Sequence, residues 1–230
     1  MKSLFDILFP PICAACGSDT KHRELLCSSC KEKLYPDPLL QCSVCRGRVP
    51  FFASRQERCH PNASHLIFSA SEYANPVVRS LIWHFKFKSR KKAGGLLSAI
   101  LFEAISDVGY NLEETILVPI PLFPKRLRER GFNQAEKIAD YLSDKLNLKK
   151  VSCLLRVKNT TPQSEISDYK QRRVNIAHAF EVKHGSGPFN KRIFLIDDVW
   201  TSGATMSEAV SVLKNAGAGE IIAMVVARAH

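Results

Sequence analysis

The 230-residue chain is long enough for one medium-sized domain and a small second one, and its 45% hydrophobic and 24% charged residues are typical of a globular protein. Its formal charge of +11 favours anionic partners such as phosphates and nucleic acids. The longest apolar runs, around residues 3–12 and 93–105, fall short of the about 20 residues that a membrane-spanning helix needs, and no cleavage pattern follows the first, so we expect a cytoplasmic protein without an anchor.

Seven of the eight cysteines lie in the first 60 residues, a region without long periodic segments. Cys13-x-x-Cys16 and Cys27-x-x-Cys30 are two knuckles, each able to present two thiolates to one tetrahedral zinc ion. A segment this small needs a metal or disulfides, and the reducing cytosol favours structural zinc. The eighth, Cys153, lies in an apolar run and is predicted to be a buried core thiol.

A second candidate zinc site is less complete than the first. Its candidate ligands are Cys42, Cys45, Cys59 and His60. Asn62 stands where a second cysteine of the last knuckle would fall. Three cysteines and one histidine can hold zinc, with His60 or His65 as the fourth ligand, and the alternative is a vestigial site held by packing. The sequence leaves this question open.

From about residue 65 onward, predicted strands and helices alternate. The strands are expected over 65–73, 115–121, 151–158, 179–182, 192–199 and 220–229, and the helices over 75–87, 92–109, 132–146 and 205–219. Apolar, β-branched strands separated by helices predict an α/β fold around a mostly parallel sheet flanked by helices. We therefore divide the chain into a cysteine-rich zinc-ribbon domain over 1–64 and an α/β domain over 65–230.

The strand over 192–199 runs directly into Asp197-Asp198 and then into a turn of small and hydroxyl residues. Ligands of open α/β sheets bind beyond the carboxyl ends of the strands. The free N–H groups of a helix N-terminus, together with Thr and Ser hydroxyls, suit a phosphate, and Gly203 lets the backbone approach closely. Two carboxylates suit a polyol or its metal ion, so the segment predicts a site for a phosphorylated ribose. The phosphate-binding residues would be Thr201, Ser202, Gly203, Ala204 and Thr205. In the alternative, one aspartate caps a helix and the other is solvated. An apolar strand followed by Asp-Asp and Thr-Ser-Gly-x-Thr is too specific a pattern to favour that interpretation.

This segment resembles the phosphoribosyl-pyrophosphate (PRPP) signature of type I phosphoribosyltransferases, and the whole chain resembles the competence protein F (ComF) family. The wider resemblance rests on the paired CxxC knuckles, on VPIPLFPKRLRERGFNQAE and on RVKNTTPQSEISDYKQRRVNIAHAF. It implies a phosphoribosyltransferase-like domain in which Asp197 and Asp198 hold the ribose hydroxyls, directly or through Mg²⁺. The chain departs from the family pattern at Asn62 and His178, where a cysteine and a glycine are usual.

A basic turn follows the strand over 115–121 and would face the pyrophosphate. Its cations are Lys125, Arg126, Arg128 and Arg130. Arginine suits a polyphosphate because its planar fork donates hydrogen bonds in pairs. A solvated basic helix start is the alternative.

The polar stretch over 156–175 is longer than a usual connection of about 4–6 residues, which indicates a lid. Arg172 and Asn175 match the family's Arg-x-x-Asn, and Thr160 and Gln163 match its Thr-x-x-Gln. Closure would exclude water and bring Arg172 towards the anion. A surface loop with an exposed helix is the alternative. If the chain is an enzyme, pyrophosphate leaves ribose C1 with Asp197, Asp198 and Arg172 as the catalytic residues, but no nucleobase pocket is recognisable.

The segment over 79–92 combines six basic residues with Trp83, Phe85 and Phe87 and contains no acid. Interleaved cations and aromatic rings can bind single-stranded DNA, although some of these rings must face the core of a helical segment. The candidate DNA-contacting residues are Lys86, Lys88, Lys91 and Lys92.

The family resemblance implies a role in natural transformation, in which the protein helps incoming single-stranded DNA into the cytoplasm beside proteins of the uptake machinery. Two other functions compete with it. One is a phosphoribosyltransferase of nucleotide synthesis or salvage with a structural zinc module, and the other is a zinc-ribbon adaptor with an inactive PRPP site. The intact Asp197-Asp198 pair counts against the adaptor.

Overall fold

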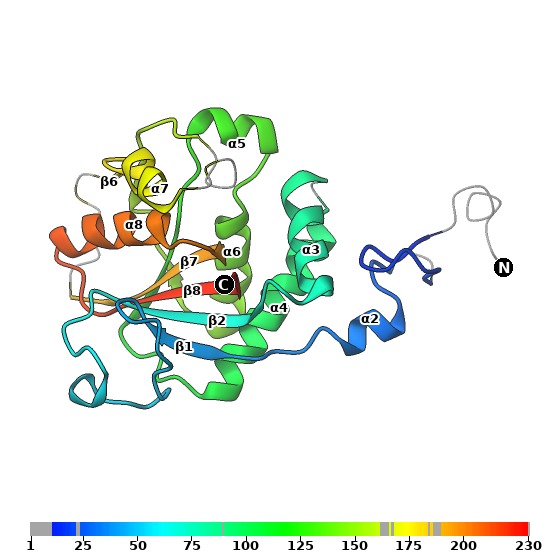
Figure 1. The fold of residues 1–230 in the computed structure, drawn as a ribbon, viewed down its shortest axis with the longest axis horizontal. Coiled ribbons are helices and arrows are strands. Elements are labelled where there is room, and N and C mark those ends of the chain that lie inside the picture. Colours follow the sequence, from blue (N-terminus) through cyan, green and yellow to red (C-terminus); the bar gives the residue numbers. More distant parts are fainter. Residues whose placement is uncertain are drawn as a thin grey trace.

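The chain folds into an α/β body with a smaller cysteine-rich lobe beside it (Figure 1). The computed structural model describes residues 11–21, 24–88, 90–161, 166, 168–183, 185 and 190–229. Within these ranges the predicted fold class is confirmed, because a mostly parallel sheet lies between layers of helices.

The main sheet has six strands in the order β1-β2-β8-β7-β3-β4. The strands are β1 (Leu39–Cys42), β2 (Leu66–Glu72), β3 (Thr115–Pro119), β4 (Lys149–Lys150), β7 (Arg192–Trp200) and β8 (Ile221–Arg228). Only the edge strand β1 is antiparallel to its neighbour among these pairs. Two further strands, β5 (Leu154–Arg156) and β6 (Phe180–Val182), form a separate antiparallel pair.

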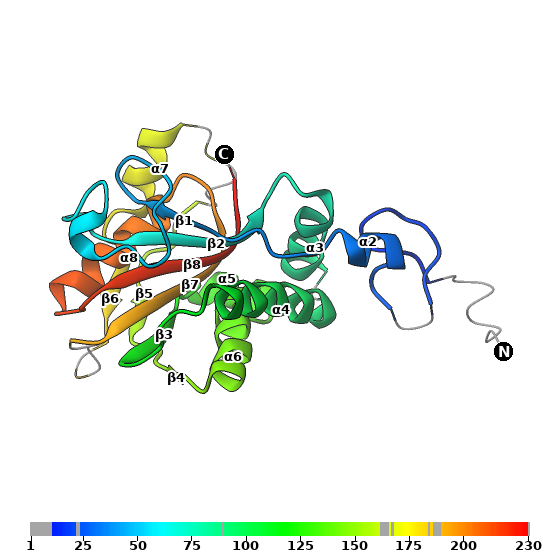
Figure 2. The same ribbon diagram turned by 90° about the horizontal axis from the view of Figure 1, so that it is seen from below.

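Helices cover both faces of the sheet (Figure 2). They are α2 (Ser28–Glu32), α3 (Pro76–Phe87), α4 (Lys91–Val108), α5 (Pro124–Arg130), α6 (Gln134–Leu146), α7 (Tyr169–Ile176) and α8 (Ala204–Asn215), with a 3-10 turn η1 (Arg55–Glu57). Along β7, Phe194 and Ile196 pack with α3, α4 and α6, whereas Ile193 and Leu195 pack with α8. The central strands are therefore buried on both faces, which explains their continuous apolar sequence.

The expected helices and the expected central strands all form, and their local signals are visible in the structure. Asn75 caps α3, because its Oδ1 accepts hydrogen bonds from the backbone N–H groups of Val77 (2.9 Å) and Val78 (3.3 Å). Pro76 follows at the first helical position, where its missing N–H costs nothing. Cys153 is fully buried, as predicted.

The cysteine-rich lobe packs against α3 (Figure 1). The carbonyl oxygen of Ala14 accepts hydrogen bonds from Ser80 Oγ (2.5 Å) and His84 Nε2 (3.2 Å). β1, which precedes residue 64, joins the sheet of the α/β body, and the domain boundary at residue 64 stays a prediction. Within the described ranges, no helix has both the length and the apolar character needed to cross a bilayer.

Candidate functional site

A pocket of about 380 Å³ lies where β7 ends and α8 begins. Side chains from distant parts of the chain line it. They include Tyr73, Lys86, Arg126, Arg130, Arg156, Arg172, Asp197 and Asp198, together with residues 201–205. The sequence predicted most of these residues separately, and the fold brings them to one cavity at the carboxyl end of the sheet, where open α/β folds bind ligands.

The two carboxylates occupy the last part of β7. Asp198 is only 5% exposed, and its Oδ1 lies 2.9 Å from Nζ of Lys86 on α3. The backbone N–H of Asp198 donates to Asp197 Oδ1 at 2.8 Å. Burial, and then the charge of Asp198, raise the pKa of Asp197 to about 7. A carboxylate in such surroundings gains from any additional cation, and this is the property expected of a metal-assisted sugar site.

The predicted phosphate loop connects β7 to α8. Gly203 has φ +78°, and a Cβ atom there would lie 2.6 Å from Nε1 of Trp200. Only glycine fits both the left-handed backbone and the contact with the indole ring. The loop delivers the free N–H groups of the first turn of α8 to the pocket, as an anion site requires.

Trp200 supports this loop from beneath and is itself 7% exposed. The guanidinium carbon of Arg46, which directly follows Cys45, lies 5.1 Å from the centre of its ring. Such a distance is typical of a cation–π contact. The segment that carries Cys42 and Cys45 thus contacts the tryptophan that packs against Gly203 of the phosphate loop, a relationship that no sequence motif indicated.

Two of the four cations of the basic turn reach the pocket, Arg126 and Arg130. Lys125 and Arg128 lie on the same helix, α5, and do not line it. Burial lowers the pKa of Arg130, whose Nη1 donates to Gln134 Oε1 at 3.1 Å. The two arginines therefore face the carboxylates across the cavity.

Arg156 is a pocket residue that sequence reasoning did not single out. It ends β5, its Nη2 donates to Thr160 Oγ1 at 2.5 Å, and its guanidinium carbon lies 5.4 Å from the centre of the Phe180 ring. Burial, and then the charge of Arg126, lower its pKa to about 10. Its place at the start of the third family segment was the available signal.

Within the predicted lid over 156–175, Thr161 and the last residue, Asn175, are joined by two hydrogen bonds. Asn175 Nδ2 donates to the carbonyl of Thr161 (2.9 Å), and the backbone N–H of Thr161 donates to Asn175 Oδ1 (3.2 Å). Arg172 lies between them in sequence and lines the pocket, with its Nε donating to the carbonyl of Ile166 at 2.7 Å. Gln163 lies outside the described residues. His178 has φ +56°, the left-handed conformation that explains why glycine is usual there.

The four lysines predicted to contact DNA have different surroundings. Lys86 lines the pocket and pairs with Asp198, whereas Lys88 Nζ lies 5.4 Å from the centre of the exposed Trp83 ring. Lys91 and Lys92 open α4 and are exposed. The aromatic rings separate as well: Phe85 is buried, while Trp83 and Phe87 are 46% and 62% exposed.

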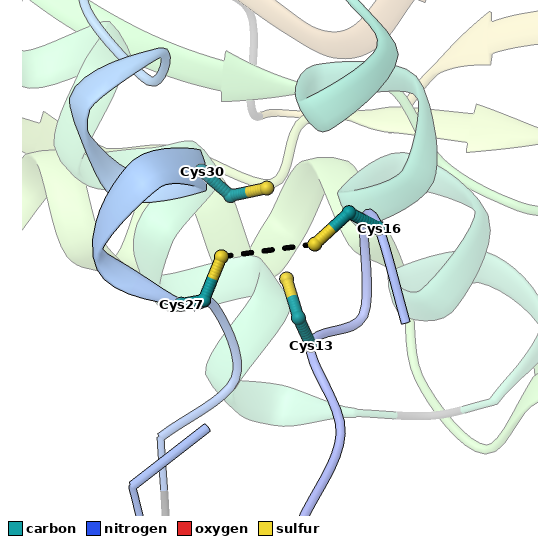
Figure 3. A group of neighbouring side chains, drawn as sticks. All are labelled: Cys13, Cys16, Cys27 and Cys30. Carbon is teal, nitrogen blue, oxygen red and sulfur yellow. Dashed lines mark hydrogen bonds between the residues drawn. The ribbon is translucent and has the colours of Figure 1, made fainter. Parts of the chain in front are cut away.

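The first cysteine cluster brings four sulfur atoms towards one point (Figure 3). Its members are Cys13, Cys16, Cys27 and Cys30, whose sulfurs all lie within 4.8 Å of one another. Cys16 and Cys27 are 3.7 Å apart. Tetrahedral zinc with bonds of about 2.3 Å separates its sulfur ligands by about 3.8 Å, so the cluster fits structural zinc. Hydrogen bonds from Ser18 lower the pKa of Cys16 to about 6, which favours the thiolate that zinc requires.

The fold also brings together the candidate ligands of the second cysteine cluster. Its ligand atoms, from Cys42, Cys45, Cys59 and His60, again lie within 4.8 Å of one another. Cys45 and Cys59 are 3.4 Å apart, and Cys42 Sγ is 3.5 Å from His60 Nδ1. The backbone N–H of Gly47 lowers the pKa of Cys45 to about 7. His65, the other histidine considered, is buried against Ser64 Oγ (3.0 Å) and lies outside this group. None of the eight cysteines forms a disulfide.

Comparisons with known proteins agree with both halves of the chain. Residues 4–74 match the double zinc ribbon domain, and residues 97–230 match the phosphoribosyl transferase domain. Competence protein F of Haemophilus influenzae is 30% identical over 213 residues, which cover 89% of this chain and 90% of that protein. DNA utilization protein YhgH of Salmonella typhimurium is 27% identical over 91% of this chain and 87% of its own length. Competence protein ComFC of Bacillus subtilis is 28% identical over 86% and 81%, respectively.

Proposed function

The chain belongs to the competence protein F family, and from that premise we propose that it is a cytoplasmic PRPP-binding protein that assists single-stranded DNA uptake during natural transformation. One observation carries the ligand assignment. Two acidic side chains, a helix N-terminus and four arginines from three other segments line a single pocket at the end of β7. A ribose that carries a phosphate at C5 and a pyrophosphate at C1 offers a complementary group to each of these.

In this proposal the loop over 201–205 binds the 5-phosphate through backbone N–H groups and hydroxyls. Asp197 and Asp198 hold the ribose hydroxyls, directly or through Mg²⁺, for which carboxylate oxygens are suitable hard ligands. Bound Mg²⁺ would neutralise the negative charge of the carboxylates and of the pyrophosphate. The pyrophosphate would lie against Arg126, Arg130 and Arg156, and Arg172 would move closer to it as the lid closes. Lys125 and Arg128, which lie on α5 outside the pocket lining, would act on the pyrophosphate only through their longer-range charge.

Calorimetric titration of PRPP with Mg²⁺ into zinc-loaded protein tests the site. We expect saturable binding by the wild type and at least about a hundredfold weaker binding by an Asp197→Asn/Asp198→Asn variant, which is about 2.7 kcal/mol. Asp140→Asn, a carboxylate remote from the pocket, is the control and should bind as the wild type does. A folded wild type that does not bind would overturn the proposal and favour the adaptor function.

A DNA surface adjoins this pocket in the proposal, on the exposed side of α3. Two observations support it: Trp83 and Phe87 are exposed, and Lys88, Lys91 and Lys92 lie near them in the sequence. Bases stack on exposed rings while lysines follow the phosphates. Lys86, at the same end of α3, would connect this surface to the PRPP site.

Fluorescence anisotropy of a labelled oligothymidine at moderate salt tests this surface. We expect a Trp83→Ala/Phe87→Ala variant to bind at least about tenfold more weakly, since each stacked base contributes about 1–3 kcal/mol. Lys88→Gln/Lys91→Gln/Lys92→Gln should weaken binding and reduce its salt dependence. The matched control removes three lysines from elsewhere, at positions 137, 145 and 149. Binding that all variants retain would exclude this surface.

Phosphoribosyl transfer is the second candidate function, and one observation favours it. Tyr73 lines the same pocket as the carboxylates and provides an aromatic wall against which a planar acceptor can stack. Asp197, Asp198 and Arg172 would then be the catalytic residues. The test is PRPP-dependent release of pyrophosphate in the presence of purine and pyrimidine bases, and no release with any base would exclude this reaction for these acceptors.

A further inference from the structure

A second cavity, of about 450 Å³, lies at the opposite end of the sheet from the PRPP pocket. Its walls come from the connection between β1 and β2 on one side and from the first residues of β7 and β8 on the other. Lys214, near the end of α8, completes it. We propose that this cavity is an anion site that binds a phosphate group between the α/β body and the second zinc ribbon, by which we mean the segment that contains Cys42, Cys45, Cys59 and His60.

Charge is the first argument for an anion. The lining contains four basic side chains, Arg55, Arg58, Arg192 and Lys214, and one acidic side chain, Glu220. Glu220 is shared: Arg58 Nη2 lies 2.7 Å from its Oε1, and Arg192 Nε lies 2.9 Å from its Oε2. One carboxylate between two guanidinium groups leaves an excess of positive charge at the cavity wall.

The other two cations, Arg55 and Lys214, form no ion pair with an acidic side chain in the part of the chain that the structure describes, although the charge of Glu220 also acts on Lys214. Lys214 Nζ donates to the carbonyl of Gly219, and Arg55 Nε donates to the carbonyl of Pro61 at 2.8 Å. Carbonyl groups satisfy a donor but do not neutralise its charge. Burial, and then the charge of Arg55, lower the pKa of Lys214, which is consistent with cations that crowd one another. A bound anion would remove this repulsion.

Unused donors are the second argument. Nε of Arg58 is buried and has no hydrogen-bond partner among the described residues, and the whole side chain is only 18% exposed. His65 lines the cavity at 5% exposure and adds an imidazole beside the hydroxyl of Ser64. Buried donors are almost always hydrogen-bonded in folded proteins, so such a group indicates a missing acceptor.

The arrangement fits a phosphate better than a carboxylate. The cations approach from different elements, Arg55 and Arg58 from the ribbon side and Arg192 and Lys214 from the α/β side. A phosphate presents at least three acceptor oxygens that point in different directions, so it can contact more cations at once than the two coplanar oxygens of a carboxylate can. A ligand held in this way would bridge the two parts of the chain.

Titration of inorganic pyrophosphate into the zinc-loaded full chain at low ionic strength tests the proposal. The wild type should bind two equivalents, one in each pocket. Arg55→Gln/Lys214→Gln should weaken one of the two sites at least about tenfold and leave PRPP affinity within about twofold. The matched control, Arg48→Gln/Lys149→Gln, removes the same charge outside both cavities and should keep both equivalents.

The proposal is overturned if the wild type binds pyrophosphate only in the PRPP pocket, or if the control loses as much affinity as the cavity variant. Thermal unfolding and zinc content verify that each variant folds. The single variant Arg55→Gln, at an exposed side chain, keeps the test available if the double variant does not fold, with the same expected loss at one site.

A phosphate could reach this cavity from a free compound or from a DNA backbone, and competition separates these sources. If a 15-nucleotide oligothymidine displaces pyrophosphate from the second site, the ligand is the phosphodiester chain. If pyrophosphate binds there and the oligonucleotide does not compete, the ligand is a free phosphate compound. If the PRPP proposal fails, the wild type would bind one equivalent instead of two. The loss of the second-cavity equivalent in Arg55→Gln/Lys214→Gln would still test this proposal, because that cavity does not include the carboxylates at the end of β7.

Discussion

Lys86 and Asp198 form an ion pair of 2.9 Å that joins α3 to the end of β7 inside the PRPP pocket. The side chains are 24% and 7% exposed, so solvent screens this pair only weakly. The protein thus supplies its own cation to one of two adjacent carboxylates. Lys86 stabilises the carboxylate of Asp198, and it lies where Mg²⁺ or a ligand group would also interact with that residue.

Replacing Lys86 should therefore destabilise the fold. Lys86→Met leaves the buried Asp198 unpaired, and we expect the free energy of unfolding to fall by about 1–3 kcal/mol. Urea unfolding at pH 7 measures this change. Lys137→Met is the matched control, because Lys137 forms a solvent-exposed pair with Asp140 that should contribute under about 1 kcal/mol. Equal losses of unfolding free energy in the two variants would mean that the buried pair stabilises the fold no more than the exposed pair does.

Asp197 should make stability depend on pH in the opposite sense to an ordinary surface carboxylate. Its pKa is about 7 in the folded protein, against a usual value of 3.8. Between these values the folded state binds a proton that the unfolded state has released. The stabilising contribution of this proton is fully present below about pH 4 and is lost as the pH rises through 7.

Asp197→Asn removes this titration, and its neutral amide avoids the penalty of a buried charge. We expect the variant to exceed the wild type in unfolding free energy by about 1–4 kcal/mol at pH 8, and by progressively less towards pH 5. Asp140→Asn should behave oppositely at neutral pH. Burial raises the pKa of Asp140, but hydrogen bonds from Lys150 and Lys137 outweigh this and lower it. A pH-independent difference for Asp197→Asn would contradict the assignment.

Two neighbouring glycines of α4 should respond to alanine with opposite signs. A Cβ on Gly94 would lie 2.4 Å from Cε2 of the buried Phe85, whereas a Cβ on Gly95 would meet nothing within 4 Å. Gly94→Ala must displace Phe85, at an expected cost of about 1–3 kcal/mol. Gly95→Ala should gain about 0.5–1 kcal/mol, because alanine is the better helix former. Thermal unfolding of the two variants provides the comparison, and a stabilised Gly94→Ala would show that α3 and α4 can separate without loss.

Much of the fold could be predicted from the sequence, because most helices and central strands carry their own signals within a short segment. Three elements illustrate this. An apolar run predicts the strand that ends near Asp197-Asp198, Asn75 caps the helix that follows it, and Gly109 ends the next helix. β1 and β4 were missed, since strands of four and two residues have no detectable period and depend on their neighbours in the sheet.

The sequence indicated which kinds of residue form the site, but it indicated less well which side chains the fold brings together there. Asp197, Asp198 and the loop after them form one continuous motif. Lys86 was assigned to a DNA surface because its segment is basic, and nothing local indicates that this one side chain turns towards Asp198. Contacts such as this one and the stacking of Arg46 on Trp200 join residues more than 100 positions apart, and no local pattern in the sequence indicates them.

Zinc content should be two equivalents per chain. The first cluster supplies four thiolates, and the second supplies three with His60. Cys13→Ser/Cys16→Ser should remove one equivalent and Cys45→Ser/Cys59→Ser the other, as measured by elemental analysis of purified protein. A single equivalent that survives the second pair of substitutions would mean that the Cys42–His60 group is held by packing alone. That would restore the vestigial alternative for this cluster.

The contact between Arg46 and Trp200 links the second cysteine cluster to the phosphate loop, and its loss should affect both the fluorescence of Trp200 and the binding of PRPP. Trp83 and Trp200 are the only tryptophans, so in a Trp83→Phe background the fluorescence reports on Trp200 alone. Arg46→Ala should expose one face of the indole, shift its emission to longer wavelength and weaken PRPP binding about twofold to tenfold, since the ring supports Gly203.

Cys45→Ser/Cys59→Ser should produce the same shift, because Arg46 follows Cys45 directly and its position depends on the metal. Arg48→Ala, an exposed arginine two residues further on, is the control and should change neither signal. If Arg46→Ala leaves the emission unchanged, or if zinc loss weakens PRPP binding without any change in emission, the second zinc ribbon does not act on the loop through this pair.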